Sequence, residues 1–120
     1  MPSFEPWDVV KLPFPGIALA EEHRPALVIA AGRLATHHDL LWTLMITSAT
    51  HPPWPMDVPI TDLRSAGLPA PSVVRCAKLA TILASRAQKI GILAAPAERA
   101  AIARHLASTL APATGRQTNM

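Results

Sequence analysis

The chain of 120 residues contains one cysteine and no apolar run long enough to cross a membrane. The single cysteine, Cys76, excludes an internal disulfide and any zinc site that needs several thiolates. The longest apolar stretches, 26–31 and 40–46, are far shorter than the roughly 20 residues of a membrane-spanning helix. The first residues also lack the basic segment and apolar core of a signal peptide. We therefore expect a soluble protein of the cytoplasm.

Several catalytic motifs are absent as well. There is no glycine-rich phosphate loop, no nucleophile elbow, no HExxH and no CxxC, and no carboxylate pair has glycosidase character. The histidines lack carboxylate or thiol partners at metal-ligand spacing, so we expect neither a metal nor another cofactor. The side chains that remain as candidates for catalysis or binding are cations, hydroxyls and histidines. This set suits metal-free RNA cleavage, in which the ribose 2′-OH is the nucleophile and the protein moves protons and stabilises charge on phosphorus.

The charge is small but unevenly distributed. Charged residues make up 16% of the chain, and the formal net charge is +3. Residues 1–60 contain six acidic and three basic side chains, whereas residues 61–120 contain two acidic and eight basic ones. A basic second half favours an anionic partner such as RNA or DNA. The alternative is a basic face that is simply solvated.

Thirteen prolines restrict the fold, because proline removes a backbone donor and clashes with the preceding helical turn. Before residue 71, only the window 26–51 could hold a long helix, and its two runs of valine, isoleucine, leucine and threonine favour strands. Half of the residues are hydrophobic, which is enough for one compact core. We expect a mainly β fold with some α, a small barrel or tight two-layer sheet, with strands at about 7–12, 26–31, 40–47, 57–60, 73–79 and 88–93.

Two segments carry helix signals. Segment 61–67 begins with a capping threonine and ends with a glycine suited to the left-handed position after a helix. Segment 96–110 begins with proline, carries Glu98 near the positive end of the helix dipole, and repeats apolar residues every four positions. We therefore expect one domain over residues 1–110, followed by a flexible tail over 111–120.

Polar residues stand at the ends of two predicted strands. Arg24 precedes Pro25, which holds the arginine backbone extended at the start of a strand. Thr47 and Ser48 end the next strand, and only one of them can face a site beside Arg24, because successive strand residues face opposite ways. A fixed guanidinium beside a hydroxyl suits the binding of a phosphate. Alternatively, Arg24 pairs with a preceding glutamate at the surface, and the hydroxyls bond only to the backbone.

Four further residues are candidates for substrate binding, namely Ser48, His23, Arg75 and Arg86. Arg75 lies inside an apolar strand and therefore needs a partner such as Asp57 or a bound phosphate. Cys76, beside it, is expected to be a small buried residue rather than a nucleophile.

The histidines and one tryptophan add to these candidates. His23, His37, His38 and His51 offer general acid–base capacity near neutral pH. Trp54 stands among three prolines, which place it either on an exposed loop near a partner or folded back over the sheet.

The order of five segments resembles the MazF/PemK family, the toxins of bacterial toxin–antitoxin pairs that cut RNA. The resemblance covers about residues 4–110. The matching segments are Trp7-Asp8-Val9-Val10 with Pro13-Phe14-Pro15, Arg24-Pro25-Ala26-Leu27-Val28, Ile46-Thr47-Ser48, Gly67-Leu68-Pro69 with Ser72-Val73-Val74, and Lys78-Leu79-Ala80-Thr81-Ile82. No single segment is specific, but their common order is.

This resemblance implies a small SH3-like β-barrel of the MazF/CcdB type with a short helix and a C-terminal helix. It implies a toxin of a type II toxin–antitoxin system that forms a homodimer and whose RNA groove is covered by a cognate antitoxin. The implied activity is that of a metal-independent, sequence-selective endoribonuclease, or mRNA interferase, which cuts single-stranded RNA to 2′,3′-cyclic phosphate and 5′-hydroxyl ends. Arg24 would act on the scissile phosphate as acid/base or as transition-state stabiliser, and Thr47 would hydrogen-bond the same phosphate.

The chain departs from the family pattern at two places. Some relatives rely on an Arg-Cys-Asp triplet, but this chain has Arg75-Cys76-Ala77 and so lacks the acidic base. Segment 16–20 is apolar where many relatives are polar, in a loop that helps to choose the RNA sequence in the family.

A second resemblance, to CcdB-like toxins, implies a non-enzymatic alternative that binds DNA gyrase through the C-terminal helix. A third alternative is a toxin-like scaffold without activity. The presence of both Arg24 and Thr47 favours the nuclease.

Overall fold

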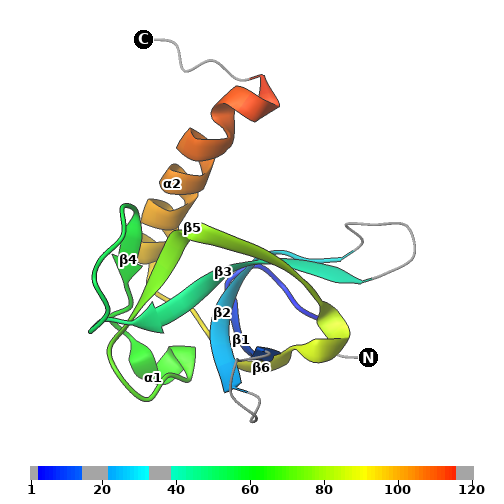
Figure 1. Ribbon diagram of the computed structural model, residues 1–120, viewed down its shortest axis with the longest axis vertical. Coiled ribbons are helices and arrows are strands. Elements are labelled where there is room, and N and C mark those ends of the chain that lie inside the picture. Colours follow the sequence, from blue (N-terminus) through cyan, green and yellow to red (C-terminus); the bar gives the residue numbers. More distant parts are fainter. Residues whose placement is uncertain (1–2, 15–21, 33–38, 116–120) are drawn as a thin grey trace.

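The computed structural model of the protein describes residues 3–14, 22–32 and 39–115. Six strands, two α-helices and one 3-10 turn follow one another in this part of the chain (Figure 1). In chain order they are β1 (Asp8–Phe14), β2 (Glu22–Ala30), β3 (Leu40–Ser48), β4 (Asp57–Pro59), α1 (Leu63–Ala66), β5 (Ser72–Leu83), η1 (Ala84–Arg86), β6 (Gln88–Ile92) and α2 (Pro96–Thr114). The six strands expected from the sequence are all confirmed. The loop at 16–20 and His37-His38 lie outside the described residues.

Two strands extend further than expected. β2 begins at Glu22, before Pro25, while its ladder with β3 starts only at Ala26. Residues 22–25 pair with β1, so Pro25 lies where one flank of the strand is unpaired and its missing N–H is tolerated. β5 continues to Leu83, because β3 pairs with it from Ser48 back to Leu40.

The strands form one antiparallel sheet in the order β4-β5-β3-β2-β1-β6. The sheet curls (Figure 1), but its edge strands β4 and β6 do not pair with each other within the described residues. In place of the closed SH3-like barrel that we expected, the fold is therefore an open, curled sheet with helices. β4 is too short to close it, since it has three residues and ends at Pro59, which has no N–H to donate.

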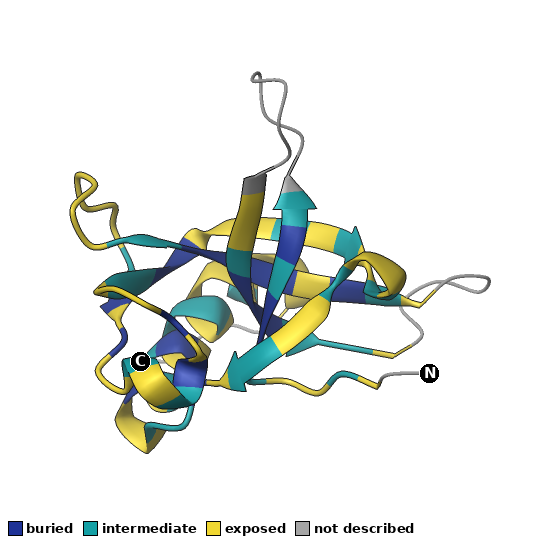
Figure 2. Cartoon of the chain, turned by 90° about the horizontal axis from the view of Figure 1, so that it is seen from below, coloured by how far each residue is buried: buried dark blue, intermediate teal, exposed yellow. Residues whose placement is uncertain are grey.

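Both faces of the sheet are buried, which explains why its central strands are continuously apolar in the sequence. Consecutive residues face opposite sides, so Val9 and Leu27 enter one core while Val10 and Ala26 enter the other. The first core lies between the sheet and the helices, and the second lies inside the curl of the sheet. Figure 2 shows the buried positions along the strands.

The short helix α1 is capped differently from the expectation. Its N-cap is Asp62, whose carboxylate accepts hydrogen bonds from the backbone N–H and the hydroxyl of Ser65. Gly67 ends the helix in the left-handed conformation, with φ 72°, as expected. Thr61 instead donates from its N–H and its hydroxyl to Oε2 of Glu98, at 3.0 and 2.6 Å, and thereby ties the chain before α1 to the first turn of α2.

Helix α2 packs on the sheet only near its start. Ile102 is fully buried and Leu106 half-buried, but Leu110 is 42% exposed, because the helix projects away from the sheet (Figure 1). The helix continues four residues past Leu110, through Pro112 to Thr114, and the end of the expected tail, 116–120, lies outside the described residues. Neither described helix is long and apolar enough to span a membrane.

Candidate functional site

Arg24 and Thr47 lie at neighbouring strand ends. Ala26 of β2 pairs with Met45 of β3 at the end of the ladder between these strands, and Arg24 and Thr47 each lie two residues beyond this pair. Strand alternation then turns both side chains toward the face that carries Met45. Arg24 and Thr47 line the same two cavities, although 23 positions separate them in the sequence.

Two adjoining cavities share Arg24, Ile46 and Thr47 as a common wall. The small cavity, of about 130 Å³, is lined by Arg24, Met45, Ile46, Thr47, Arg75 and Lys78. The large cavity, of about 460 Å³, is lined by Lys11, His23, Arg24, Pro25, Ile46, Thr47, Ser48, His51, Gly67, Leu68, Pro69, Ala70, Pro71, Ser72 and Ile90. A phosphate held at the common wall would have a cavity on either side for the groups attached to it.

The charge in these cavities has one sign. The small cavity holds three cationic side chains, and the large cavity holds Lys11, Arg24 and two histidines. Among the described residues that line either cavity there is no carboxylate. Such a surface attracts an anion and stabilises negative charge that develops on it.

Five of the six predicted site residues line these cavities. Arg24, Thr47 and Arg75 line the small one, while His23 and Ser48 join Arg24 and Thr47 in the large one. The sixth, Arg86, is exposed in η1 and lines neither.

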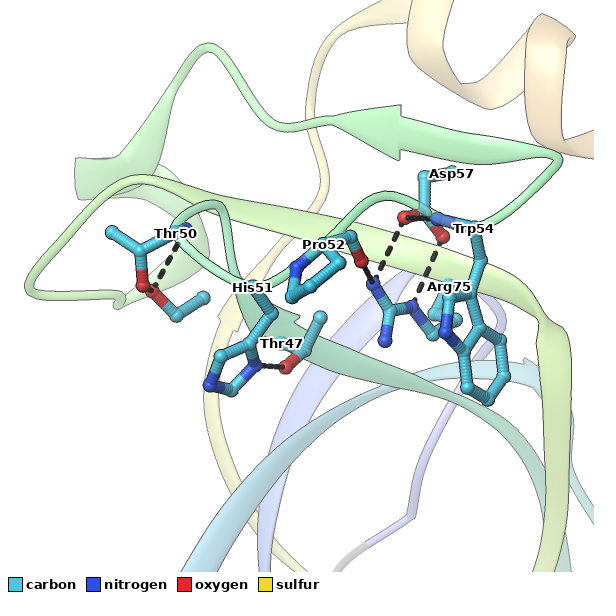
Figure 3. A network of polar contacts seen from close by, with 8 residues as sticks. Thr47, Thr50, His51, Pro52, Trp54, Asp57 and Arg75 are labelled. Atoms are coloured by element: carbon cyan, nitrogen blue, oxygen red, sulfur yellow. Dashed lines mark hydrogen bonds and ion pairs between the residues drawn. The ribbon is translucent and has the colours of Figure 1, made fainter.

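Thr47 is hydrogen-bonded to a histidine from the loop that follows β3. Its Oγ1 lies 2.7 Å from Nδ1 of His51, as Figure 3 shows. The neighbouring Ser48 side chain bonds instead to Thr50, with its Oγ 2.8 Å from the threonine Oγ1 and accepting from the Thr50 N–H at 3.2 Å. The two adjacent hydroxyls therefore have different partners, and Thr47 is the one that is bonded to an imidazole.

Arg75 anchors the loop 49–56, which carries His51. Its Nε and terminal nitrogen donate to the two carboxylate oxygens of Asp57 at 3.2 and 3.1 Å, and the same terminal nitrogen donates to the carbonyl of Pro52 at 3.0 Å (Figure 3). The guanidinium also lies under the ring of Trp54, 4.3 Å from its centroid. Asp57 is thus the partner that a buried Arg75 needed, and the two together hold both ends of the turn at 52–54.

The pKa of Asp57 reflects this pairing. Burial acts to raise the pKa of the carboxyl, but hydrogen bonds from Arg75 and the Trp54 N–H, together with the Arg75 charge, outweigh it and hold the pKa below its usual range. Trp54 lies on an exposed loop, as one of our two alternatives had it, with 43% of its surface exposed while it stacks on Arg75.

Cys76 is a buried thiol, as expected from the sequence. Burial, with a smaller contribution from the Asp57 charge, raises its pKa to about 11. The thiol is therefore protonated at neutral pH and is a poor nucleophile.

A model of the PemK-like, MazF-like toxins of type II toxin–antitoxin systems matches residues 5–110. The chain belongs to this family. Two solved structures have the same fold. The Mycobacterium tuberculosis toxin MazF-mt6 is 23% identical, covers 88% of this chain and 96% of its own, and superposes with a TM-score of 0.61. A chain of the MazE–MazF complex from Deinococcus radiodurans is 18% identical, covers 96% and 99%, and has a TM-score of 0.66. No curated protein sequence matches this toxin closely enough to report.

The sequence did not single out three cationic or titratable side chains that line this toxin's cavities. His51 was only one of several histidines, and its place beside Thr47 depends on the folded loop. Lys78 lines the small cavity because β5 bulges there, with three residues inserted between the partners of Met45 and Leu44. Lys11 comes from β1 and reaches the large cavity through the sheet order. Of these three residues, only Lys78 could have been noticed in the sequence, because its charge interrupts the apolar residues of its strand.

The residues that the structure describes offer no metal centre, because they contain no group of three histidine, cysteine or carboxylate side chains close enough to hold an ion. The described side chains at and around the common wall are cations, hydroxyls and imidazoles. These groups can bind an anion, stabilise charge and transfer protons.

Proposed function

We propose that this toxin is a metal-independent, sequence-selective endoribonuclease that cuts single-stranded RNA to 2′,3′-cyclic phosphate and 5′-hydroxyl ends. The observation that supports it most is the common wall of the two cavities, which Arg24 and Thr47 both line and where Thr47 bonds to His51. A pure protein-binding toxin needs no such group of a cation, a hydroxyl and an imidazole. The cationic side chains among the described lining residues fit an RNA backbone.

In this proposal the scissile phosphate binds at the common wall. Two N–H groups of the Arg24 guanidinium donate to its non-bridging oxygens, and the Thr47 hydroxyl donates to one of them. Negative charge on these oxygens grows as the 2′-oxygen attacks, so the same bonds strengthen in the transition state. Arginine stays protonated in proteins, and the role of Arg24 is therefore to stabilise this charge rather than to exchange a proton.

The proposed partners are a cognate antitoxin and a second copy of the chain. The solved MazE–MazF complex supports the antitoxin, which would compete with RNA for the cationic cavities. The homodimer is supported by large apolar side chains that remain exposed on the β3–β5 pair, with Trp42 at 40%, Leu79 at 50% and Leu83 at 41%. An exposed apolar surface of this kind commonly marks a protein interface.

The function is tested by incubating purified toxin with a long single-stranded RNA in excess EDTA and mapping the ends of the fragments. We expect cleavage with cyclic phosphate ends, and a loss of about 10²–10³ in rate for Arg24→Ala, the typical effect of removing one transition-state donor. Arg24→Lys should also be slow, because a point charge does not reproduce the planar fork. Arg104→Ala is the matched control, since Arg104 is exposed on α2 and lines neither cavity.

Two outcomes would contradict the proposal. Arg24→Ala cutting RNA at the wild-type rate would refute the assignment of the site. Intact RNA together with inhibited DNA gyrase would refute the nuclease and favour the CcdB-like alternative.

A further inference from the structure

We propose that the small cavity is a subsite for a second phosphate of the RNA, one adjacent to the scissile phosphate, and that Lys78 is the side chain that binds it. This inference rests on the proposed nuclease function and adds the path of the RNA backbone beyond the common wall. Lys78 comes from β5, the strand that pairs with β3. Its role is to bind a part of the RNA that does not react.

A bulge in β5 turns Lys78 into the small cavity. Met45 of β3 pairs with Arg75, but the residue before Met45 pairs only with Leu79, so three residues of β5 stand between the two partners. With regular alternation, Lys78 would lie on the same side as Cys76, which packs in the core between the sheet and the helices. Lys78 instead lines the cavity that Arg75 and Met45 line. Bulges beside functional sites commonly re-aim a side chain in this way.

The charge of Lys78 differs from that of its neighbour in the cavity. The guanidinium of Arg75 is balanced by Asp57, to which it donates at 3.2 and 3.1 Å. Within the described residues, no carboxylate lies at ion-pair distance from Lys78, which is exposed. A lysine ammonium group is a common ligand of phosphate, and as a point charge on a flexible stem it tolerates small shifts of the anion.

The chemistry of the two cavities indicates which part of the RNA each one receives. The scissile phosphate is linked to a nucleotide on either side, so the RNA leaves the common wall in two directions. The large cavity, of about 460 Å³, is lined in part by Leu68, Pro69 and Ile90, and apolar side chains suit the faces of a base. The small cavity, of about 130 Å³, is half lined by cations, which suit the next phosphate of the backbone.

A contact with a non-reacting phosphate stabilises the bound substrate and the transition state equally. Lys78→Gln should therefore raise KM and leave kcat within a few-fold of the wild type. We expect the affinity for RNA to fall about 10-fold, as is typical for the loss of one charge-assisted hydrogen bond. Arg24→Ala should instead lower kcat, because Arg24 acts on the scissile phosphate.

The test uses a short RNA that spans a cleavage site mapped on the long RNA, with a 2′-deoxy sugar at the cleaved position so that it cannot be cut. Two further versions each carry an uncharged methylphosphonate in place of one of the phosphates that flank the scissile one. The Kd of each RNA is measured for the wild type and for Lys78→Gln. One of the two replacements should weaken binding to the wild type about 10-fold but have little effect on Lys78→Gln, because the variant no longer binds that charge.

Two other lysine variants are the matched controls. Lys89→Gln removes the same charge outside both cavities, where Lys89 pairs with Asp8 at 3.2 Å, and Lys11→Gln removes one from the large cavity. Both should keep the wild-type sensitivity to the replaced phosphate, since neither lines the small cavity. The melting temperature of Lys78→Gln should match the wild type, because the side chain is exposed.

Three outcomes would overturn the inference while the nuclease stands. In the first, the two replacements affect Lys78→Gln as strongly as the wild type. In the second, Lys11→Gln loses the sensitivity to the same phosphate. In the third, Lys78→Gln lowers kcat and leaves KM unchanged, which would assign the lysine to the scissile phosphate. If wild-type toxin cuts no RNA, the proposed function fails and this inference with it.

Discussion

Asp57→Asn should lower the free energy of unfolding of this toxin by about 3 kcal/mol, because it leaves the buried Arg75 charged and without its counter-ion. The two side chains are each only 9% exposed and are joined by hydrogen bonds of 3.2 and 3.1 Å. Loss of one partner of a buried pair typically costs about 3–5 kcal/mol. Arg75 keeps its bond to the Pro52 carbonyl and its contact with Trp54, so we expect the lower end of that range.

The assay is urea unfolding at pH 7 of the wild type, Asp57→Asn and a control, Asp62→Asn. The control should change little, because asparagine is as good a helix N-cap as aspartate. A loss of about 3 kcal/mol corresponds to a melting temperature lower by about 10 °C for a domain of this size. Equal unfolding midpoints for wild type and Asp57→Asn would refute the view that this ion pair holds the loop.

The pH dependence of the free energy of unfolding provides a second test of the Asp57–Arg75 pair. The pKa of Asp57 is lowered in the folded state, so its contribution is complete above the ordinary carboxyl pKa of about 3.9 and is lost as the pH falls through the lowered value. The stability difference between wild type and Asp57→Asn should therefore be constant near neutrality and shrink below about pH 4. A difference that grows with acidification would contradict the pairing.

Two further predictions concern binding. Trp54→Ala should weaken binding to an uncleavable RNA or to the antitoxin more than it lowers the melting temperature. The reason is that Trp54 is 43% exposed and stacks on Arg75, which lines the small cavity. Unchanged binding in titrations would refute this role. Affinity for the same RNA should fall steeply with salt, and Arg86→Ala should reduce the slope by about one if Arg86 contacts a phosphate, whereas a flat salt dependence would argue against an electrostatic contribution.

The strands of this toxin were predictable because their signals are local. Before residue 71, proline spacing excluded a long helix outside the window 26–51, and two runs of valine, isoleucine, leucine and threonine in that window favoured strands. The strand ends were less predictable, since β2 can include Pro25 only because its pairing with β3 ends at Ala26. The prediction that the sheet closes into a barrel was wrong for a similar reason. Closure depends on pairing between β4 and β6, which no local pattern encodes.

The residues of the candidate site also differ in how far the sequence predicts them. Arg24 and Thr47 could be found because each ends a strand, and an antiparallel pair brings the start of one strand to the end of the next. His51 could not be singled out, because its position depends on Arg75 binding Pro52 and Asp57, which are 23 and 18 residues away in the sequence. Local sequence thus predicts the candidate residues at the strand ends, whereas the position of His51 depends on contacts between residues far apart in the sequence.

The absent acidic residue after Cys76 bears directly on the mechanism. Ala77 stands where some relatives carry a carboxylate, and the carboxylate nearest to Arg75 comes instead from the edge strand β4. Asp57 accepts three hydrogen bonds, two from Arg75 and one from the Trp54 N–H, and its pKa is lowered, so it is a weak proton acceptor. Its carboxylate holds the loop in place and is unsuited to proton transfer. If this toxin cuts RNA, the protons must then move through groups that line the cavities rather than through Asp57, whose part is to hold the loop that carries His51.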